Sequence, residues 1–154
     1  MPNATTFTLD PLDRKILMEL QQNARITFAE IGRQIGLSTP AVIERVHRLE
    51  ESGVIEGYHA RINPAKVGLT VRAIVKISIA GDQLQRFAVR AQKVPEVLEC
   101  HRVTGSESFI LQIAATDVAH MERIIDHLMP YVATNTSIVL ASPVSWSPIH
   151  LSKD

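Results

Sequence analysis

Residues 27–53 read TFAEIGRQIGLSTPAVIERVHRLEESG, and this stretch decides the fold of the N-terminal part. Thr27 and Glu30 stand at the spacing of a capping box, which predicts that a short helix begins there. Gly36 ends that helix in a tight turn, and Ser38 or Thr39 then caps a second helix with Pro40 near its start. Two helices joined by a glycine turn are typical of a helix-turn-helix, whose second helix enters the DNA major groove.

The second helix of this pair has an apolar side and a polar side. Val42, Val46 and Leu49 recur at helical spacing and predict the inward face. The candidate DNA contacts are the residues at the helix start and on its polar face: Ser38, Thr39, Ala41, Glu44, Arg45, His47 and Arg48. Arg45 lies nearer the apolar side, so a structural ion pair is an equal alternative for it. Three helices of an ordinary small bundle are the alternative for the whole segment.

A further helix is predicted to precede this pair. Asp10 suits the N-cap, Pro11 the first helical position, and Asp13 the first turn, where a negative charge is favourable. Residues 1–56 carry eight acidic and six basic side chains, a net charge of −2. Because such a surface offers little general attraction to phosphates, we expect one subunit alone to bind DNA weakly.

The second half of the chain changes from helical to alternating periodicity. From Val71 every second residue is apolar, which predicts a half-buried strand. The pattern then predicts a helix near 84–91, strands at 97–103 and 109–115, a helix capped by Asp117, and a strand at 137–141. This β-α-β-β-α-β order is ferredoxin-like. We therefore expect an α/β (α+β) protein: a winged helix-turn-helix domain at 1–56, an extended linker at 57–69, and a ferredoxin-like domain at 70–154.

Composition excludes several classes of protein. The chain has 154 residues, of which 45% are hydrophobic and 21% charged, with a formal net charge of zero. No apolar run approaches the length of a membrane span, and the polar N-terminus lacks the apolar core of a signal peptide, so a cytoplasmic protein that contacts no membrane is expected. The single cysteine, Cys100, excludes an internal disulfide and is interpreted as a small core residue.

Nothing in the sequence predicts catalysis. The six histidines include no pair at i, i+4 spacing, and nucleophile-elbow, phosphate-loop and dinucleotide motifs are absent. We therefore expect no enzyme, no metal and no cofactor, although some ferredoxin-like dimers are small enzymes. Trp146 is expected to pack the C-terminal tail on a domain.

Several motifs resemble the Lrp/AsnC, or feast/famine, transcription regulators. In the N-terminal half these are residues 9–17, 23–25, 36–38 and 44–55; in the second half they are Pro95–Cys100 and Val103–Gly105. The resemblance runs from Leu9 to about Pro143. It implies double-stranded DNA as a partner, a homodimer built through the sheet domain and assembled further into tetramers or octamers, and a small effector, usually an amino acid.

The resemblance also places the effector site at a subunit interface. The implied positions are the glycine loop after the second strand and two threonines near the last strand: Thr104, Gly105, Ser106, Glu107, Ser108, Thr134 and Thr136. The turn glycine exposes backbone N–H groups for a carboxylate, and hydroxyls or Glu107 suit an ammonium. Ser108 departs from the family, which usually has an acidic residue before the aromatic of the next strand. A plain hairpin turn remains the alternative for this loop. For the whole chain, the alternatives are an architectural DNA-bending protein and an amino-acid-binding module that does not bind DNA.

Overall fold

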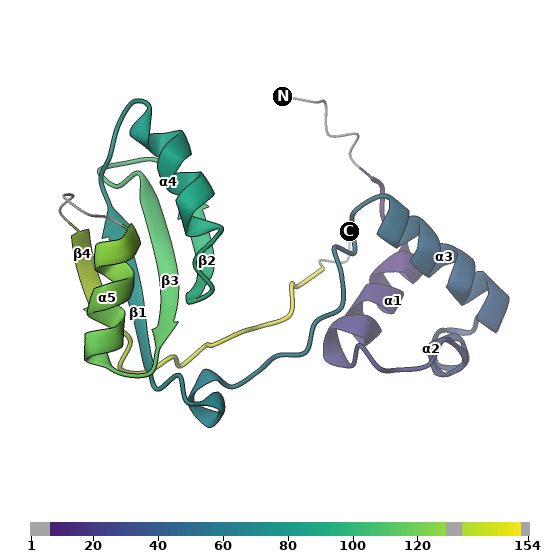
Figure 1. Ribbon diagram of the computed structural model, residues 1–154. Helices are drawn as coiled ribbons and strands as arrows, with labels where there is room; N and C mark the ends of the chain where they lie inside the picture. Colours follow the sequence, from purple (N-terminus) through teal and green to yellow (C-terminus); the bar gives the residue numbers. More distant parts are fainter. Residues whose placement is uncertain (1–6, 129–133, 152–154) are drawn as a thin grey trace. The chain divides into compact units, whose positions relative to one another are not determined.

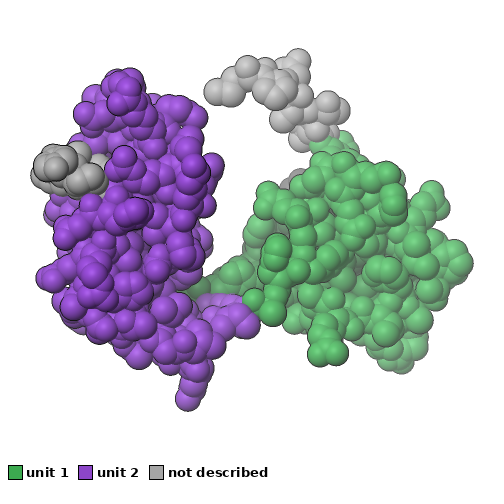
Figure 2. Space-filling model, in the orientation of Figure 1, with its two compact units in different colours: residues 1–60, 144–154 green, residues 61–143 purple. Residues whose placement is uncertain are grey.

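The computed structural model describes residues 7–128 and 134–151, which divide into two compact units (Figures 1 and 2). Unit 1 comprises Met1–Ala60 together with Val144–Asp154, and unit 2 comprises Arg61–Pro143. This division differs at the C-terminal end from the predicted one, because residues 144–154 group with the helical unit and not with the sheet.

Unit 1 consists of the three expected helices, α1 (Pro11–Gln22), α2 (Phe28–Ile35) and α3 (Thr39–Glu51). Asp10 and Asp13 form a reciprocal capping box at the start of α1. At α2 only half of the predicted box forms: Thr27 accepts from the Glu30 backbone N–H, while the Glu30 side chain binds Arg33 instead. The described part of unit 1 contains no strand, so the predicted wing is not found there.

The turn between α2 and α3 depends on two glycines. Gly36 has a φ of 76°, a conformation that favours glycine, and it ends α2 as predicted. Gly32 is buried inside α2, and a Cβ built on it would lie 2.5 Å from the carbonyl oxygen of Leu37. The turn can therefore pack onto α2 only because residue 32 has no side chain. Around this turn lies the apolar core of the unit: Ile16, Leu17, Leu20, Ile31, Val42, Val46 and Leu49.

The C-terminal tail completes unit 1. The Gln21 side chain accepts a hydrogen bond from the Ile149 backbone N–H at 2.7 Å and donates one to the Ile149 carbonyl at 3.2 Å. Leu151 packs against the apolar core of the unit, and Trp146 lies beside the same surface. The tail is thus part of the helical unit, because Gln21 forms hydrogen bonds with the Ile149 backbone and Leu151 packs against the core.

Unit 2 has the predicted ferredoxin-like order. Its elements are a 3-10 turn at Pro64–Val67, β1 (Val71–Ile77), α4 (Gln83–Ala91), β2 (Val97–Arg102), β3 (Phe109–Ala115), α5 (Val118–Leu128) and β4 (Thr134–Ile138). The sheet is antiparallel in the order β2-β3-β1-β4. Two predictions are corrected here. The last strand begins three residues earlier than expected, and the linker is interrupted by the 3-10 turn, where Asn63 accepts from the Ala65 N–H.

The two faces of the sheet differ in character. Ala73, Val75 and Ile77 of β1 are buried with Phe87 of α4 and Met121 of α5 in one apolar core, so α4 and α5 cover this helix-facing side. The alternate residues Arg72, Ile74 and Lys76 lie on the other side. Cys100 is exposed at the edge strand β2, which corrects its interpretation as a core residue.

Candidate functional site

The start of α3 presents exposed polar groups, as predicted. Ser38 is the N-cap, and its hydroxyl accepts from the Ala41 backbone N–H at 3.4 Å. Thr39, the first helical residue, is exposed, and Ala41 is half-buried. Because the first N–H groups of a helix carry partial positive charge, this end of α3 suits a phosphate oxygen.

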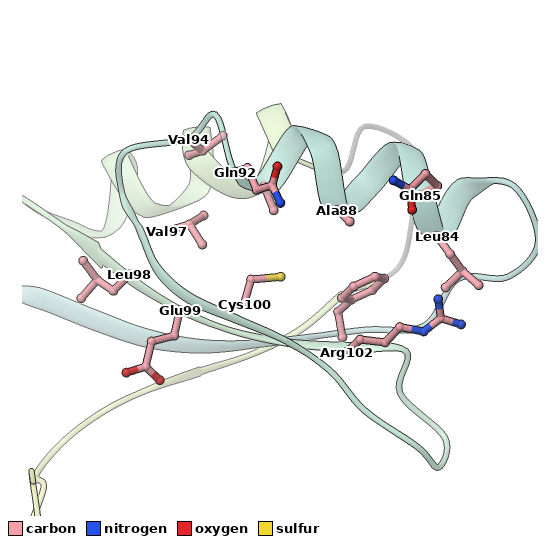
Figure 3. A pocket seen from close by; sticks show the side chains of 12 residues that line it. Leu84, Gln85, Ala88, Gln92, Val94, Val97, Leu98, Glu99, Cys100 and Arg102 are labelled. Carbon is pink, nitrogen blue, oxygen red and sulfur yellow. The ribbon is translucent and has the colours of Figure 1, made fainter. Parts of the chain in front are cut away.

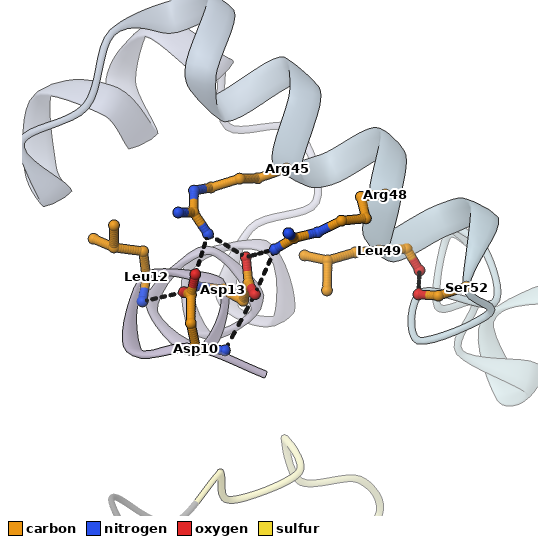
Figure 4. A network of polar contacts seen from close by, with 7 residues as sticks. All are labelled: Asp10, Leu12, Asp13, Arg45, Arg48, Leu49 and Ser52. Carbon is orange, nitrogen blue, oxygen red and sulfur yellow. Dashed lines mark hydrogen bonds and ion pairs between the residues drawn. The ribbon is translucent and has the colours of Figure 1, made fainter. Parts of the chain in front are cut away.

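Arg45 and Arg48 turn away from the outer face of α3 and bind the capping box of α1 (Figure 4). Arg45 Nη1 lies 2.7 Å from Asp13 Oδ1 and also contacts Asp10, while Arg48 Nη2 lies 2.8 Å from Asp13 Oδ2. Asp13 is fully buried, whereas the side chains of Arg45 and Arg48 are 25% and 51% exposed. Arg45 therefore forms the structural ion pair that is the alternative for it. Arg48 is expected on the free polar face of α3, but its side chain binds Asp13 instead.

The electrostatics of this network favour the charged forms. Burial acts to raise the pKa of Asp10, but the Asp13 backbone N–H and the Arg45 guanidinium hold that pKa below its usual value. The pKa of Arg45 is raised because Asp10, and then Asp13, accept its hydrogen bonds. The Arg48 guanidinium also lies 5.4 Å from the ring centroid of Phe7, within cation–π range. The network fixes α3 against α1 and so sets the orientation of the helix.

The free outer face of α3 is formed by Glu44, His47 and Ile43. Glu44 and His47 are exposed as predicted, and His47 Nδ1 lies 3.2 Å from Glu51 Oε1 in the next turn. Ile43, which sequence reasoning missed, is 47% exposed. Its position one turn from both Thr39 and His47 is the signal that points to it. A carboxylate, an imidazole and an apolar side chain can read a cytosine amino group, a purine edge and a thymine methyl, respectively.

The predicted effector loop 104–108 joins β2 to β3 in unit 2. Thr104, Gly105 and Ser106 are exposed, and Gly105 has a φ of 118° with open space around its Cα. The Ser106 carbonyl accepts from the Ser78 hydroxyl at 2.9 Å, which fixes the loop to the end of β1.

Ser108 and Glu107 have different roles within this loop. The Ser108 hydroxyl donates to the Ile79 carbonyl and accepts from the Ile79 N–H, so both of its hydrogen-bonding functions serve the fold. The Glu107 pKa is lowered, first by the hydrogen bond from the Ser106 hydroxyl and further by Lys76. Of these two predicted ligand residues, only Glu107 therefore offers a charge, and it is ionised.

Thr134 and Thr136 lie on β4, where they pair with Ile77 and Val75 of β1. Phe109, which directly follows the loop, pairs with Ile77 from the opposite side. Strand β1 thus separates the two threonines from the loop within one chain. The structure places both groups on one sheet, on opposite sides of β1, and does not bring them together within one chain.

Comparison with known proteins covers both units. Residues 9–50 match the AsnC-type helix-turn-helix domain, and residues 72–149 match the Lrp/AsnC ligand binding domain. The chain belongs to the Lrp/AsnC family. It is therefore a transcription regulator that binds DNA through its helix-turn-helix and carries a ligand-binding domain. The family's ligand-binding region extends to residue 149 and so includes part of the tail that packs on unit 1.

Individual members of the Lrp/AsnC family are similar over most of their length. The regulator LrpC of Bacillus subtilis (strain 168) is 34% identical over 133 residues, which cover 86% of this chain and 92% of LrpC. The leucine-responsive regulatory protein of Escherichia coli (strain K12) is 36% identical over 120 residues, 76% of this chain and 73% of that protein. A transcriptional regulator from Neisseria meningitidis, solved in complex with L-Met, superimposes with a TM-score of 0.85 at 30% identity, covering 93% of this chain and 97% of that one.

Two negative findings concern the described residues of this Lrp/AsnC chain. None of its described helices is both long and apolar enough to cross a membrane. Over residues 7–128 and 134–151, histidine, cysteine and acidic side chains form no group that could hold a metal ion.

Proposed function

We propose that α3 reads operator DNA in the major groove with its outer face, and that Arg45 and Arg48 position the helix instead of contacting bases. The observation that carries this proposal is the buried Asp13, which both arginines bind. Thr39 then contacts phosphate at the helix start, while Glu44 and His47 reach base edges. Ser38 and Ala41 support the contact through the capped backbone.

The charge of the helical unit indicates binding by more than one subunit. Residues 1–56 have a net charge of −2, and the arginines of α3 are already paired with carboxylates. We infer that a homo-oligomer supplies the affinity, because two or more helices bound to one DNA add their contacts. The sheet face that carries Ile74 and Ile110, both half-buried and on the side opposite α4 and α5, is the proposed dimer surface. Tetramers or octamers are the proposed further assembly.

The proposed effector is an amino acid. Gly105 exposes backbone for a carboxylate, and the ionised Glu107 suits an ammonium group. Since β1 separates Thr134 and Thr136 from this loop, a second copy of the chain would have to bring the two groups together at an interface. The L-Met complex of the Neisseria relative supports this class of ligand. The proposed role is regulatory and not catalytic, and the proposed compartment is the cytoplasm.

Fluorescence anisotropy tests the DNA-binding role. The full chain is titrated onto DNA from upstream of its own gene, across a salt series and against random competitor. Tight binding that survives competitor and weakens with salt supports a sequence-specific regulator. Equal binding to both DNAs would identify the architectural alternative, and no binding by a folded oligomer, with or without each amino acid, would overturn DNA binding.

Two glutamates of α3 form a matched pair for the reading face. Glu44→Ala and Glu50→Ala each remove one negative charge from the same helix, so their long-range electrostatic effects are similar, and Glu50→Ala also removes the hydrogen bond from the Tyr58 hydroxyl. Only Glu44→Ala is expected to lose discrimination at one base pair, by about tenfold, because that carboxylate accepts from a base. Equal specificity of the two variants would remove Glu44 from the reading face.

A further inference from the structure

A hollow of about 490 Å³ lies in unit 2 between α4 and the edge strand β2 (Figure 3). Its lining is mixed: Leu84, Ala88, Val97 and Phe109 contribute apolar surface, and Gln85, Gln92, Glu99 and Arg102 contribute polar surface. None of the loop residues 104–108 lines it. Small-molecule sites are typically clefts of about 300–1,000 Å³ that combine apolar surface with a few polar groups, and the volume of this hollow lies within that range.

The alternation of β2 determines which of its side chains enter the hollow. Cys100 pairs with Leu111 and Arg102 with Phe109, and both partners are buried on the helix-facing side. Directly opposed residues point to the same face of a sheet, so Cys100 and Arg102 also lie on that side. Glu99 has the opposite parity, and its carboxylate lies 3.2 Å from His101 Nε2. The strand thus directs a thiol and a guanidinium toward α4.

One end of the hollow carries the Arg102 and Gln85 side chains, while Gln92 lies toward the other end. Figure 3 shows the Arg102 guanidinium and the Gln85 amide near Leu84, with the Cys100 thiol farther along the floor. Among the described residues, the Arg102 side chain has no ion-pair or hydrogen-bond partner, whereas Arg86 of α4 binds Asp82. The Arg102 end of the hollow therefore offers an uncompensated positive charge beside apolar surface.

We propose that this hollow binds a small monocarboxylate with an apolar body, whose carboxylate contacts Arg102 and Gln85 and whose apolar part lies along Ala88, Val97 and Phe109. A guanidinium is the side chain best suited to a carboxylate. Glu99 also borders the hollow, but its place in the strand alternation and its contact with His101 direct its carboxylate to the other face, so Arg102 is the charged group that faces a ligand at this end. The hollow therefore selects a plain carboxylate over an amino acid, and it is independent of the effector loop proposed above.

Cys100 provides a built-in reporter of occupancy. It is the only cysteine in the chain and it lines the floor of the hollow, so its alkylation by iodoacetamide reports on this site alone. Burial raises the pKa of the Cys100 thiol, and the reaction is therefore followed at alkaline pH, where more thiolate is present. Sodium hexanoate is the probe, with hexylamine as the matched amine and hexanol as the matched neutral molecule.

The expected result is a saturable slowing of alkylation by hexanoate on the full chain, with much weaker protection by hexylamine or hexanol. Arg102→Gln is expected to weaken protection by about tenfold, as for loss of one charge-assisted hydrogen bond. Arg86→Gln removes a charge from the same region outside the hollow and should leave protection unchanged. Hexanoate must also leave the rate for the urea-unfolded chain unchanged.

Three results would overturn the proposal. They are equal protection by hexanoate and hexylamine, undiminished protection in Arg102→Gln, and no protection by hexanoate at any concentration tested. Thr104→Ala separates this site from the effector loop. If that variant abolished hexanoate protection while remaining folded, the claim of an independent site would fail.

Discussion

Asp13 is fully buried in unit 1, whereas the fully buried positions in the described part of unit 2 are filled by apolar side chains. Unit 1 has a small apolar core of seven residues and adds the Asp13 network that joins α1 to α3. Unit 2 has a core of thirteen, and the ion pairs found among its described residues lie outside that core. Because a small core buries less apolar surface, the helical unit depends more on charge, and the two units should respond differently to mutation and pH.

Among the variants proposed here, Asp13→Ala is expected to lower the stability of unit 1 the most. It removes the shared acceptor of Arg45 and Arg48 and half of the capping box, which should cost unit 1 about 3 kcal/mol. Trp146 is the only tryptophan and lies in unit 1, so its fluorescence during urea unfolding follows that unit. Leu111→Ala, in the core of unit 2, is the matched variant and should leave the Trp146 transition in place. If Asp13→Ala left that transition unchanged, the network would have no stabilising role.

Gly32→Ala should destabilise unit 1 by about 2 kcal/mol, because its Cβ would lie 2.5 Å from the backbone oxygen of Leu37. Gly36→Ala is the matched control: it meets open space but requires an alanine at a φ of 76°, which costs about 1 kcal/mol. Both values come from the Trp146 transition. Equal destabilisation by the two variants would show that close packing at Gly32 is unimportant.

Removal of residues 148–154 tests the contribution of the tail. This truncation keeps Trp146 but deletes Ile149 and Leu151, and it should cost unit 1 about 1 kcal/mol through lost hydrogen bonds and apolar contact. Gln21→Ala removes the hydrogen bonds alone and should have a smaller effect. A shift of the unit 2 transition, followed by far-UV circular dichroism, would contradict the assignment of the tail to unit 1.

The smallest expected effect is on the response to acid. The lowered pKa of Asp10 means that its stabilisation is present above its unfolded value and is lost as pH falls through the folded one, below about pH 4. Asp10→Asn should therefore flatten the acid dependence of the Trp146 transition. Asp117 in unit 2 also has a lowered pKa, because the His120 N–H donates to it, and Asp117→Asn should alter only unit 2. An unchanged acid response in Asp10→Asn would contradict the prediction.

Most of the fold could be predicted because its signals are local. The caps Asp10 and Ser38, the turn at Gly36 and the alternation from Val71 each depend on residues close together in sequence, and the structure confirms them. The tail could not be placed, because its contact with Gln21 spans 128 residues. The same reason explains Arg48: a helical wheel describes one helix and contains no information about Asp13 on another.

For the candidate sites, the sequence predicts which residues share a face of a strand or helix, but not what those residues contact. Alternation shows that Cys100 and Arg102 share a face, but whether that face is covered depends on the place of β2 in the sheet. As an edge strand, β2 leaves Cys100 exposed, although its sequence suggests a core residue. Sequence alone also could not predict the role of Ser108, because its hydrogen bonds join it to Ile79, just beyond the end of β1 and 29 residues away.

The return of the tail to unit 1 makes the ligand-binding domain an insertion within the DNA-binding domain. The chain leaves unit 1 after Ala60 and re-enters it at Val144. A chimaera that exchanges the ligand-binding domain at a single linker junction would therefore replace the residues that Gln21 binds, and would carry a foreign tail. An exchange with two junctions, at Ala60 and at Pro143, keeps the helical unit complete. This boundary pair is the one to use for grafting a new ligand specificity onto this DNA-binding domain.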